Sequence, residues 1–259
     1  MKKLLITALL FSGVGFAKES TQTNSLDYQT LIKEKKYKQA FKKLTEEADK
    51  NDLAKVVFID YNMQCISYYA DYKTHMRDFI GNKDKVNMCR ALSSIYPHKS
   101  GYINGVAGMY NSALKYTKML ENSSNKKMLQ IAHFDHANLL SIKTTNYLVH
   151  KQIKVDYEQA IENYKKALEL NAIKDITNNS ALRLAYLYAN GLGTLQDASS
   201  AEKYYNIAIS NGSIVAKCAL GELYIKEKKI SKAKEILKEG YKEGAKVCGK
   251  IWKQYNLGM

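Results

Sequence analysis

Apolar residues recur every three or four positions along the C-terminal part of the chain, which is the spacing of an amphipathic helix. The clearest case covers residues 156–170, where alanine, tyrosine and leucine form one stripe among charged residues. Alanine in such a stripe lets a neighbouring helix approach closely. No stretch of the sequence alternates between apolar and polar residues as a half-buried strand does, so we predict an all-α protein. The stripe consists of Tyr157, Ala160, Ile161, Tyr164, Ala167 and Leu168.

The pattern of this helix repeats along the chain. Further copies begin at Ala201 and Ala233, which are 32 residues apart. Between the copies lie segments 184–188 and 220–224, which are spaced by 36 residues. The copies themselves are four residues closer because the second inter-helix loop is four residues shorter. A two-helix unit with a period in the mid-thirties predicts a solenoid.

These segments resemble known repeat families. Residues 156–170 resemble the second helix of a tetratricopeptide repeat, and residues 184–216 resemble a Sel1-like repeat. The resemblance is strong over residues 151–259 and implies a right-handed α/α solenoid that ends in a capping helix. The positions that fit the Sel1-like pattern are Leu184, Ala185, Tyr188, Gly191, Gly193, Asp197, Ala201, Tyr204, Tyr205, Ala208, Gly212 and Ala216.

The resemblance also predicts a binding groove. In such a solenoid, exposed residues on the first helix of each hairpin line the concave side. With Leu184, Ala185 and Tyr188 in the core, we expect the groove to be lined by Leu182, Tyr186, Glu222 and Ile225, with Tyr186 and Ile225 exposed. Most of the 20 tyrosines are expected to be packing residues of the repeat.

Residues 27–150 show helical spacing with a weaker repeat pattern. Residues 31–44 resemble a degraded tetratricopeptide hairpin. We expect this divergent helical-hairpin region to be the same solenoid with its consensus eroded. Further helices are predicted over residues 53–70, about 85–96 and about 126–149.

The first 17 residues have the pattern of a cleaved secretory signal peptide. Lys2 and Lys3 precede a mostly apolar stretch over residues 4–16, and Ala17 completes a small-residue cleavage site. This stretch is too short to span about 30 Å of hydrocarbon. We therefore expect a flexible N-terminus over residues 18–26, a mature chain without a transmembrane segment, and a periplasmic location, with secretion beyond the periplasm left open.

The net charge limits the classes of partner. The formal charge of +15 falls to +13 when the two signal-peptide lysines are removed. Only three of the 40 basic residues are arginine, the side chain preferred for bidentate contacts with phosphates and base edges. Together with export, this argues against a nucleic-acid partner. The charge fits lysine-rich solvated helix faces, and the alternative is adhesion to acidic envelope polymers or an acidic protein surface.

Four cysteines give two possible disulfides and three possible pairings, and no spacing matches a redox or zinc motif. Cys218 lies in the first helix of one repeat and Cys248 near the equivalent position of the next, so these two side chains could meet. Cys65 and Cys89 would then remain for each other. The alternative is buried free thiols in alanine-like positions.

Candidate chemistry is sparse. His133 and His136 share a helix face and could bind one metal ion, but no further ligand is signalled, and two histidines beside a core phenylalanine are the simpler interpretation. No nucleophile elbow, phosphate-binding loop or Ser-x-x-Lys motif occurs. Cysteine-rich exported Sel1-like proteins include penicillin-binding or weakly β-lactamase-like enzymes, but here Ile209 and Lys217 stand where their paired cysteines would be.

The sequence therefore predicts a non-enzymatic adaptor without a cofactor that binds protein partners of the cell envelope through a concave helical groove. Envelope assembly, cell-contact sensing and secretion-system placement are all compatible with this fold. The oligomeric state is left open.

Overall fold

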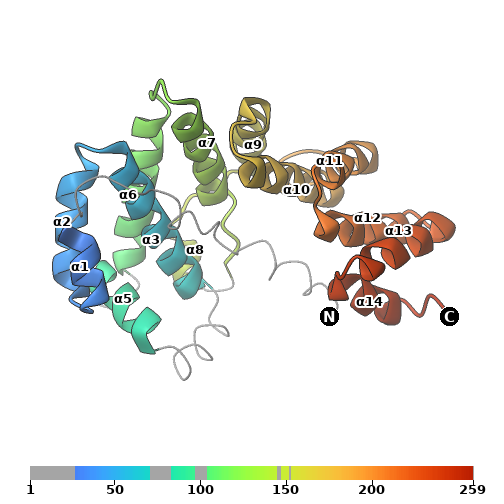
Figure 1. Ribbon diagram of the computed structural model, residues 1–259, viewed down its shortest axis with the longest axis horizontal. Helices are drawn as coiled ribbons and strands as arrows, with labels where there is room; N and C mark the ends of the chain where they lie inside the picture. The colour runs from blue at the N-terminus through green and yellow to red at the C-terminus, as the bar shows by residue number, and fades with distance from the viewer. Residues whose placement is uncertain (1–26, 71–82, 97–103, 145–146, 152, 259) are drawn as a thin grey trace. The chain divides into compact units, whose positions relative to one another are not determined.

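The computed structural model describes residues 27–70, 83–96, 104–144, 147–151 and 153–258, and every regular element in these ranges is a helix (Figure 1). The chain divides between Asp156 and Tyr157 into two compact units, and each is described by itself. The predicted signal peptide and the N-terminal segment that follows it lie outside the described residues. Among the described helices, none combines the length and the apolar character needed to cross a bilayer.

The C-terminal unit is a chain of helical hairpins in which each helix packs against the next one along the sequence. This nearest-neighbour packing confirms the predicted α/α solenoid architecture. It arises because each helix has one apolar stripe that only an adjacent helix can cover. The helices are α9 (Tyr157–Leu170), α10 (Lys174–Asn190), α11 (Ala198–Ser210), α12 (Ile214–Lys226), α13 (Ile230–Lys242) and α14 (Lys246–Gln254).

The loop between α10 and α11 carries the glycine signature of the repeat. Gly191 ends α10 in the left-handed conformation, with φ of 62°, and Gly193 also has a positive φ, of 72°. Asp197 then begins α11 by accepting hydrogen bonds from the backbone N–H groups of Ser199 and Ser200, at 2.9 and 3.0 Å. The loop thus stops one helix and caps the next within a few residues.

Two apolar clusters stabilise the C-terminal unit. The first is rich in alanine and joins α10, α11, α12 and α13, while the second surrounds Cys218, Leu237 and Cys248 near the C-terminus. Small side chains allow the helices of the first cluster to pack closely. Its buried members are Ala181, Leu182, Ala185, Ala189, Ala201, Tyr205, Ala208, Ala216, Ala219, Leu220, Leu223, Tyr224 and Ala233.

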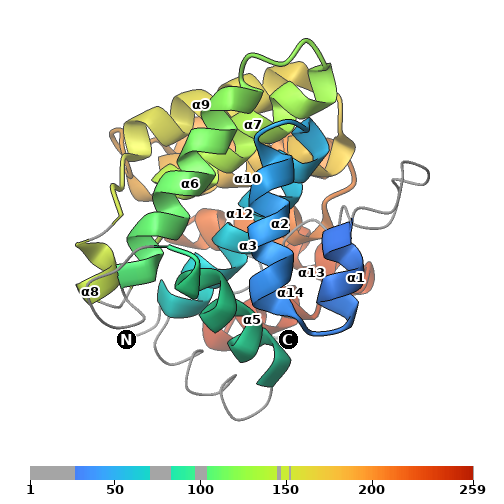
Figure 2. The ribbon, with the colours of Figure 1, turned by 90° about the vertical axis from the view of Figure 1, so that its left-hand side faces the viewer.

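The N-terminal unit is arranged around α3, which packs against α2, α5, α6, α7 and α8. Figure 2 shows α1, α2 and α5 on the side of this unit that faces the viewer. The most extensive packing of α3 is with α6, which does not follow it directly in sequence. The helices are α1 (Asp27–Lys33), α2 (Tyr37–Ala48), α3 (Asp52–Ala70), α5 (Lys83–Ser94), α6 (Asn104–Leu120), α7 (Lys126–Leu140) and α8 (Tyr147–His150).

The predicted helix over residues 126–149 is wrong in its second half. Helix α7 ends at Leu140, and Ser141 closes it by donating from its hydroxyl to the carbonyl of Ala137, at 2.8 Å. Ile142 follows outside the helix and is nevertheless buried. The apolar pattern therefore continues past the end of the helix, which is why spacing alone overestimated its length.

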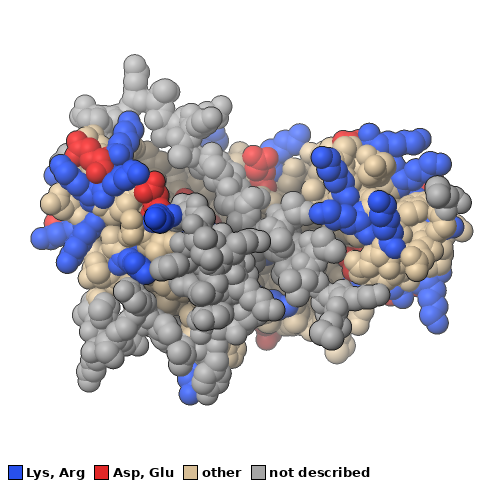
Figure 3. All heavy atoms as spheres, turned by 90° about the horizontal axis from the view of Figure 1, so that it is seen from below, with Lys and Arg blue, Asp and Glu red and all other residues tan. Residues whose placement is uncertain are grey.

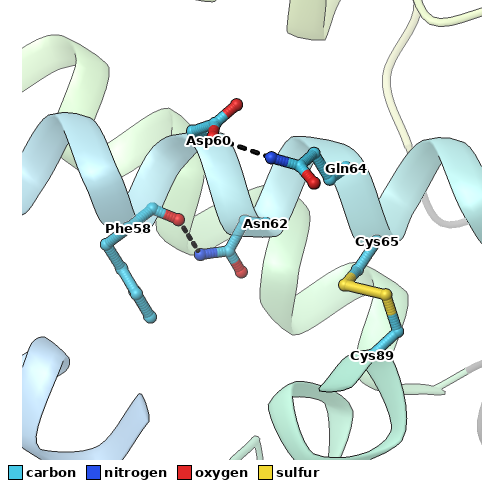
Figure 4. Close-up of a disulfide and its surroundings, with 6 residues drawn as sticks. All are labelled: Phe58, Asp60, Asn62, Gln64, Cys65 and Cys89. Atoms are coloured by element: carbon cyan, nitrogen blue, oxygen red, sulfur yellow. Dashed lines mark hydrogen bonds between the residues drawn. A yellow bond between two sulfur atoms is a disulfide. The ribbon is translucent and has the colours of Figure 1, made fainter. Parts of the chain in front are cut away.

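A disulfide ties two helices of the N-terminal unit together. Cys65 of α3 is bonded to Cys89 of α5, and both side chains are fully buried (Figure 4). One turn earlier in α3, the Asn62 amide donates to the Phe58 carbonyl at 2.6 Å and accepts from the Tyr96 hydroxyl at 2.7 Å. This buried polar side chain is thus satisfied on both its donor and its acceptor side.

Candidate protein-binding face

The first helices of the C-terminal hairpins, α10, α12 and α14, carry a set of half-buried polar and aromatic side chains. Tyr186 of α10 and Glu222 of α12 occupy equivalent positions 36 residues apart in the repeat, and Tyr255 follows directly after α14. Each of the three is partly exposed to solvent. We call this set, with Tyr157, the tyrosine face.

Glu222 is the charged centre of the tyrosine face. Its Oε1 accepts a hydrogen bond from the Tyr255 hydroxyl at 3.3 Å and lies 3.8 Å from the Lys226 ammonium group. Burial raises the pKa of the Tyr255 hydroxyl, and the negative charge of Glu222 raises it further. At neutral pH the tyrosine therefore remains a hydrogen-bond donor beside a carboxylate.

Two further tyrosines of the C-terminal unit have raised pKa values. Burial raises the pKa of the Tyr205 hydroxyl, with further contributions from Glu222 and Tyr186. The pKa of Tyr157 is also raised, first by burial and then by Tyr186. The hydroxyls of Tyr157 and Tyr205 therefore remain protonated at neutral pH. Partly exposed tyrosines beside a carboxylate suit hydrogen bonding to a polypeptide.

Two of the predicted groove residues need correction. Leu182 is only 7% exposed and belongs to the alanine-rich core, so it does not line an open groove. Ile225 is half-buried and packs against both apolar clusters of the C-terminal unit. Removing the Ile225 side chain would therefore disturb the core as well as the surface.

Sequence reasoning missed Tyr157 and Tyr255 as members of the tyrosine face. Tyr157 was assigned to the apolar stripe of its helix, and for the last residues, which include Tyr255, only a capping helix was predicted. Continuing the spacing from Tyr186 to Glu222 into the last, shorter unit would have ended near Tyr255. The last unit departs from the repeat pattern, so its register could not be assigned from the sequence.

Other tyrosines of the repeat serve packing. The rings of Tyr188 and Tyr204 stack at 5.6 Å between centroids. Tyr164 is fully buried, and the Tyr224 hydroxyl donates to Glu202 at 2.7 Å. The pKa of Tyr224 rises to about 12 through burial and this carboxylate. These contacts agree with the prediction that the repeat places tyrosine at its packing positions.

Both predicted disulfide pairs are present. Cys218 of α12 is bonded to Cys248 of α14, in addition to the Cys65–Cys89 pair, and no described cysteine is free. Cys218 and Cys248 are 1% and 0% exposed. The bond therefore fixes the first helices of the last two hairpins to each other from inside the core.

His133 and His136 do lie on one face of α7, where both approach Glu121. The Nδ1 atom of His136 is 2.6 Å from Glu121 Oε1, and that of His133 is 3.9 Å away. Among the residues that the structure describes, no group of three histidine, cysteine or acidic side chains has the geometry to hold a metal ion. The pair contacts a carboxylate that bridges it to the segment after α6.

Comparison with known proteins bears on the C-terminal unit. The family model of the Sel1 repeat matches residues 150–171 and 179–213. These two segments are similar to Sel1 repeats. Sel1 repeat scaffolds generally mediate protein–protein interaction. The matched Sel1 segments include α9, most of α10 and α11, and hence the Tyr157 and Tyr186 positions of the tyrosine face.

A solved structure described as the crystal structure of a Sel1 repeat protein from Oxalobacter formigenes resembles the chain at 21% sequence identity and a TM-score of 0.47. The match covers 87% of this chain and 72% of the other. No protein with a curated description matches the sequence.

Proposed function

We propose that this protein is an exported scaffold that binds a partner protein of the cell envelope through the tyrosine face. The observation that carries the proposal is the set of partly exposed side chains Tyr186 on α10, Glu222 on α12 and Tyr255 directly after α14. Tyrosines that combine a large ring with a hydroxyl are typical anchors of protein interfaces. The Sel1 match supports a protein rather than a small molecule as the ligand.

Two features support export. The first 17 residues have the charge, apolar length and small-residue site of a signal peptide. The two disulfides fit an oxidising compartment better than the cytosol. N-terminal sequencing of the protein from its native host tests this directly. We expect a mature chain that begins near Lys18, and a chain that still begins with Met1 would contradict export.

The binding proposal is tested by partner capture. Immobilised protein is incubated with envelope extract, captured proteins are identified, and the strongest candidate is purified for a direct affinity measurement. We expect the Tyr186→Ala/Glu222→Ala variant to weaken that affinity by about tenfold or more, because both anchors of the face are lost. A purified candidate that binds this variant as tightly as the wild type would overturn the assignment of the face.

A matched control separates binding from stability. Tyr204 is also a half-buried tyrosine of the same unit, but it stacks on Tyr188 and is not a member of the tyrosine face. Tyr204→Ala is expected to lower the melting temperature and to leave the partner affinity within about twofold of the wild type. If Tyr204→Ala weakens binding as much as the double variant, loss of folded protein explains both results.

A further inference from the structure

The segment from the end of α12 through α14 has an excess of positive charge. Residues 226–253 contain ten lysines, four glutamates, and neither aspartate nor arginine. The space-filling view in Figure 3 shows blue side chains gathered over the C-terminal unit with little red among them. Such a concentration of one sign of charge attracts ligands of the opposite sign.

The lysines form two stripes on neighbouring helices. Helix α13 carries three at a spacing of four residues, which puts them on one side of the helix about 6 Å apart along its axis. Helix α14 carries three more at spacings of four and three, and it contains no acidic residue. All six side chains are exposed, and none forms an ion pair with another described residue. They are Lys234, Lys238, Lys242, Lys246, Lys250 and Lys253, which we call the lysine face.

Two carboxylates of this region, Glu239 of α13 and Glu243 directly after it, are paired with a lysine of α12. Glu239 and Glu243 each accept a hydrogen bond from the Lys217 ammonium group of α12, at 2.6 Å. Lys217 itself is almost fully buried. Two of the four glutamates in this region are thus neutralised by a lysine outside it, and the lysine face keeps its positive charge.

An exposed aromatic ring lies between the two stripes. Tyr241 of α13 is 59% exposed, although large apolar side chains in the described part of the chain are mostly covered. Its ring lies over Gly249 of α14, where a Cβ atom would be 2.9 Å from the Tyr241 Cε2 atom. Gly249 stands between Lys246 and Lys253 on α14. Because Gly249 has no side chain, the Tyr241 ring of α13 can pack directly on α14, between the lysines of the two helices.

We propose that the lysine face and Tyr241 bind a linear acidic polysaccharide. Regularly spaced lysines match a ligand that carries a carboxylate on successive sugar rings, whereas a single pocket would suit one small anion. The flat ring of Tyr241 offers a stacking surface for the apolar face of a sugar. The absence of arginine fits single carboxylate contacts better than bidentate recognition of phosphate. This surface is distinct from the tyrosine face, and the inference is independent of the proposed function.

The alternatives fit the observations less well. A helix that binds a bilayer surface inserts large apolar side chains, but the lysine side of α14 has none that is exposed. The lysines could also serve only to make a terminal repeat polar and soluble. A mixture of lysines and glutamates would serve that purpose equally well, so solubility does not explain the excess of lysine. An acidic protein segment would also pair with the lysines, and the binding of polyglutamate distinguishes that ligand from a polysaccharide.

The test measures binding of the full mature chain to oligogalacturonate, which has one carboxylate per sugar, by titration calorimetry at low and at physiological salt. We expect binding that weakens with salt. Replacing all six lysines of the face with glutamine is expected to weaken it by about tenfold or more. Tyr241→Ala is expected to cost about fivefold, and Tyr241→Phe almost nothing, because the ring is retained.

The control variant removes the same charge elsewhere. Six exposed lysines of the N-terminal unit are replaced by glutamine, with binding expected to stay within about twofold of the wild type. Circular dichroism and melting temperatures establish that all variants fold. The control positions are Lys33, Lys38, Lys42, Lys50, Lys126 and Lys127.

Four outcomes overturn the proposal. They are absence of binding by the wild type, equal losses in the two six-lysine variants, an unchanged affinity in Tyr241→Ala, and equally tight binding to polyglutamate or to anionic phospholipid vesicles. The Tyr186→Ala/Glu222→Ala variant should bind oligogalacturonate normally. Normal binding by this variant would show that polysaccharide binding does not depend on the tyrosine face, so each of the two proposals can be rejected without the other.

Discussion

At the scale of single residues, the Sel1-type loop depends on the absence of a side chain at one position. Gly193 has a positive φ, and a Cβ atom there would overlap the backbone of Tyr157 and would lie 2.6 Å from the amide nitrogen of Glu158. Gly212 also has a positive φ, of 93°, but a Cβ atom there would meet open space. A side chain at Gly212 would therefore meet only the strain of a positive φ, whereas a side chain at Gly193 would also collide with the backbone of α9.

We predict that alanine at these two positions has unequal effects. Gly212→Ala should lower the free energy of unfolding by about 1–2 kcal/mol, the cost of a left-handed conformation. Gly193→Ala should lower it by about 2–4 kcal/mol, because the loop must also move away from the start of α9. Chemical denaturation of both variants measures the difference. Equal losses would mean that the loop relaxes freely around the new methyl group.

The groove residues show what the sequence could predict at this scale. Tyr186 and Glu222 follow from the repeat register, because equivalent positions on successive first helices share a face. Leu182 was misplaced because the same stripe argument cannot tell a residue at the edge of the core from one in the groove. Its burial depends on the neighbouring hairpin, whose distance from α10 is not encoded in the spacing of α10 itself.

At the scale of elements, α12 and α14 are joined by more than their apolar contacts. The Cys218–Cys248 bond closes a loop of 30 residues that includes all of α13. Lys217 holds α13 against α12 through two carboxylates. These covalent and ionic links add to the nearest-neighbour packing that holds a repeat array together.

We predict that Cys218→Ala/Cys248→Ala destabilises the C-terminal unit by about 3–4 kcal/mol, the loop-entropy value for this separation. Denaturation followed by near-ultraviolet or fluorescence signals of Trp252, the sole tryptophan, reports on this unit. Cys65→Ala/Cys89→Ala is the matched control and should leave the Trp252 transition unchanged. Thiol labelling of the denatured, unreduced wild type should find no free cysteine. Four reactive thiols would show that the bonds do not form.

The elements themselves were predictable to different degrees. In the C-terminal unit, the apolar stripe, the glycine loop and the capping aspartate all indicate the same helix boundaries. The end of α7 could not be found in this way, because buried Ile142 extends the apolar pattern beyond Ser141. The packing of α3 against α6 could not be predicted either, because these helices are not consecutive and the apolar spacing within each helix does not identify its partner.

At the scale of the whole molecule, the segment before α9 belongs to the N-terminal unit. The backbone N–H of Asp156 donates to the Leu140 carbonyl at 2.8 Å, and the Tyr110 hydroxyl donates to the Lys154 carbonyl at 2.7 Å. Ile153 is 7% exposed within the apolar core of that unit. Residues 153–156 thus complete the N-terminal core, although their sequence carries no helical pattern.

This assignment predicts which fragments fold. Residues 27–156 and residues 157–259 should each give a helical circular dichroism spectrum and a cooperative melting transition, because each core is built from its own residues. A fragment that ends at residue 150 is the matched control. It lacks Ile153 and the acceptor of the Tyr110 hydroxyl, so its melting temperature should fall well below that of the fragment 27–156. If both N-terminal fragments melt at the same temperature, the segment contributes nothing to that core. If the fragment 157–259 is unfolded with its disulfide formed, the Sel1-type hairpins require the N-terminal unit for their stability.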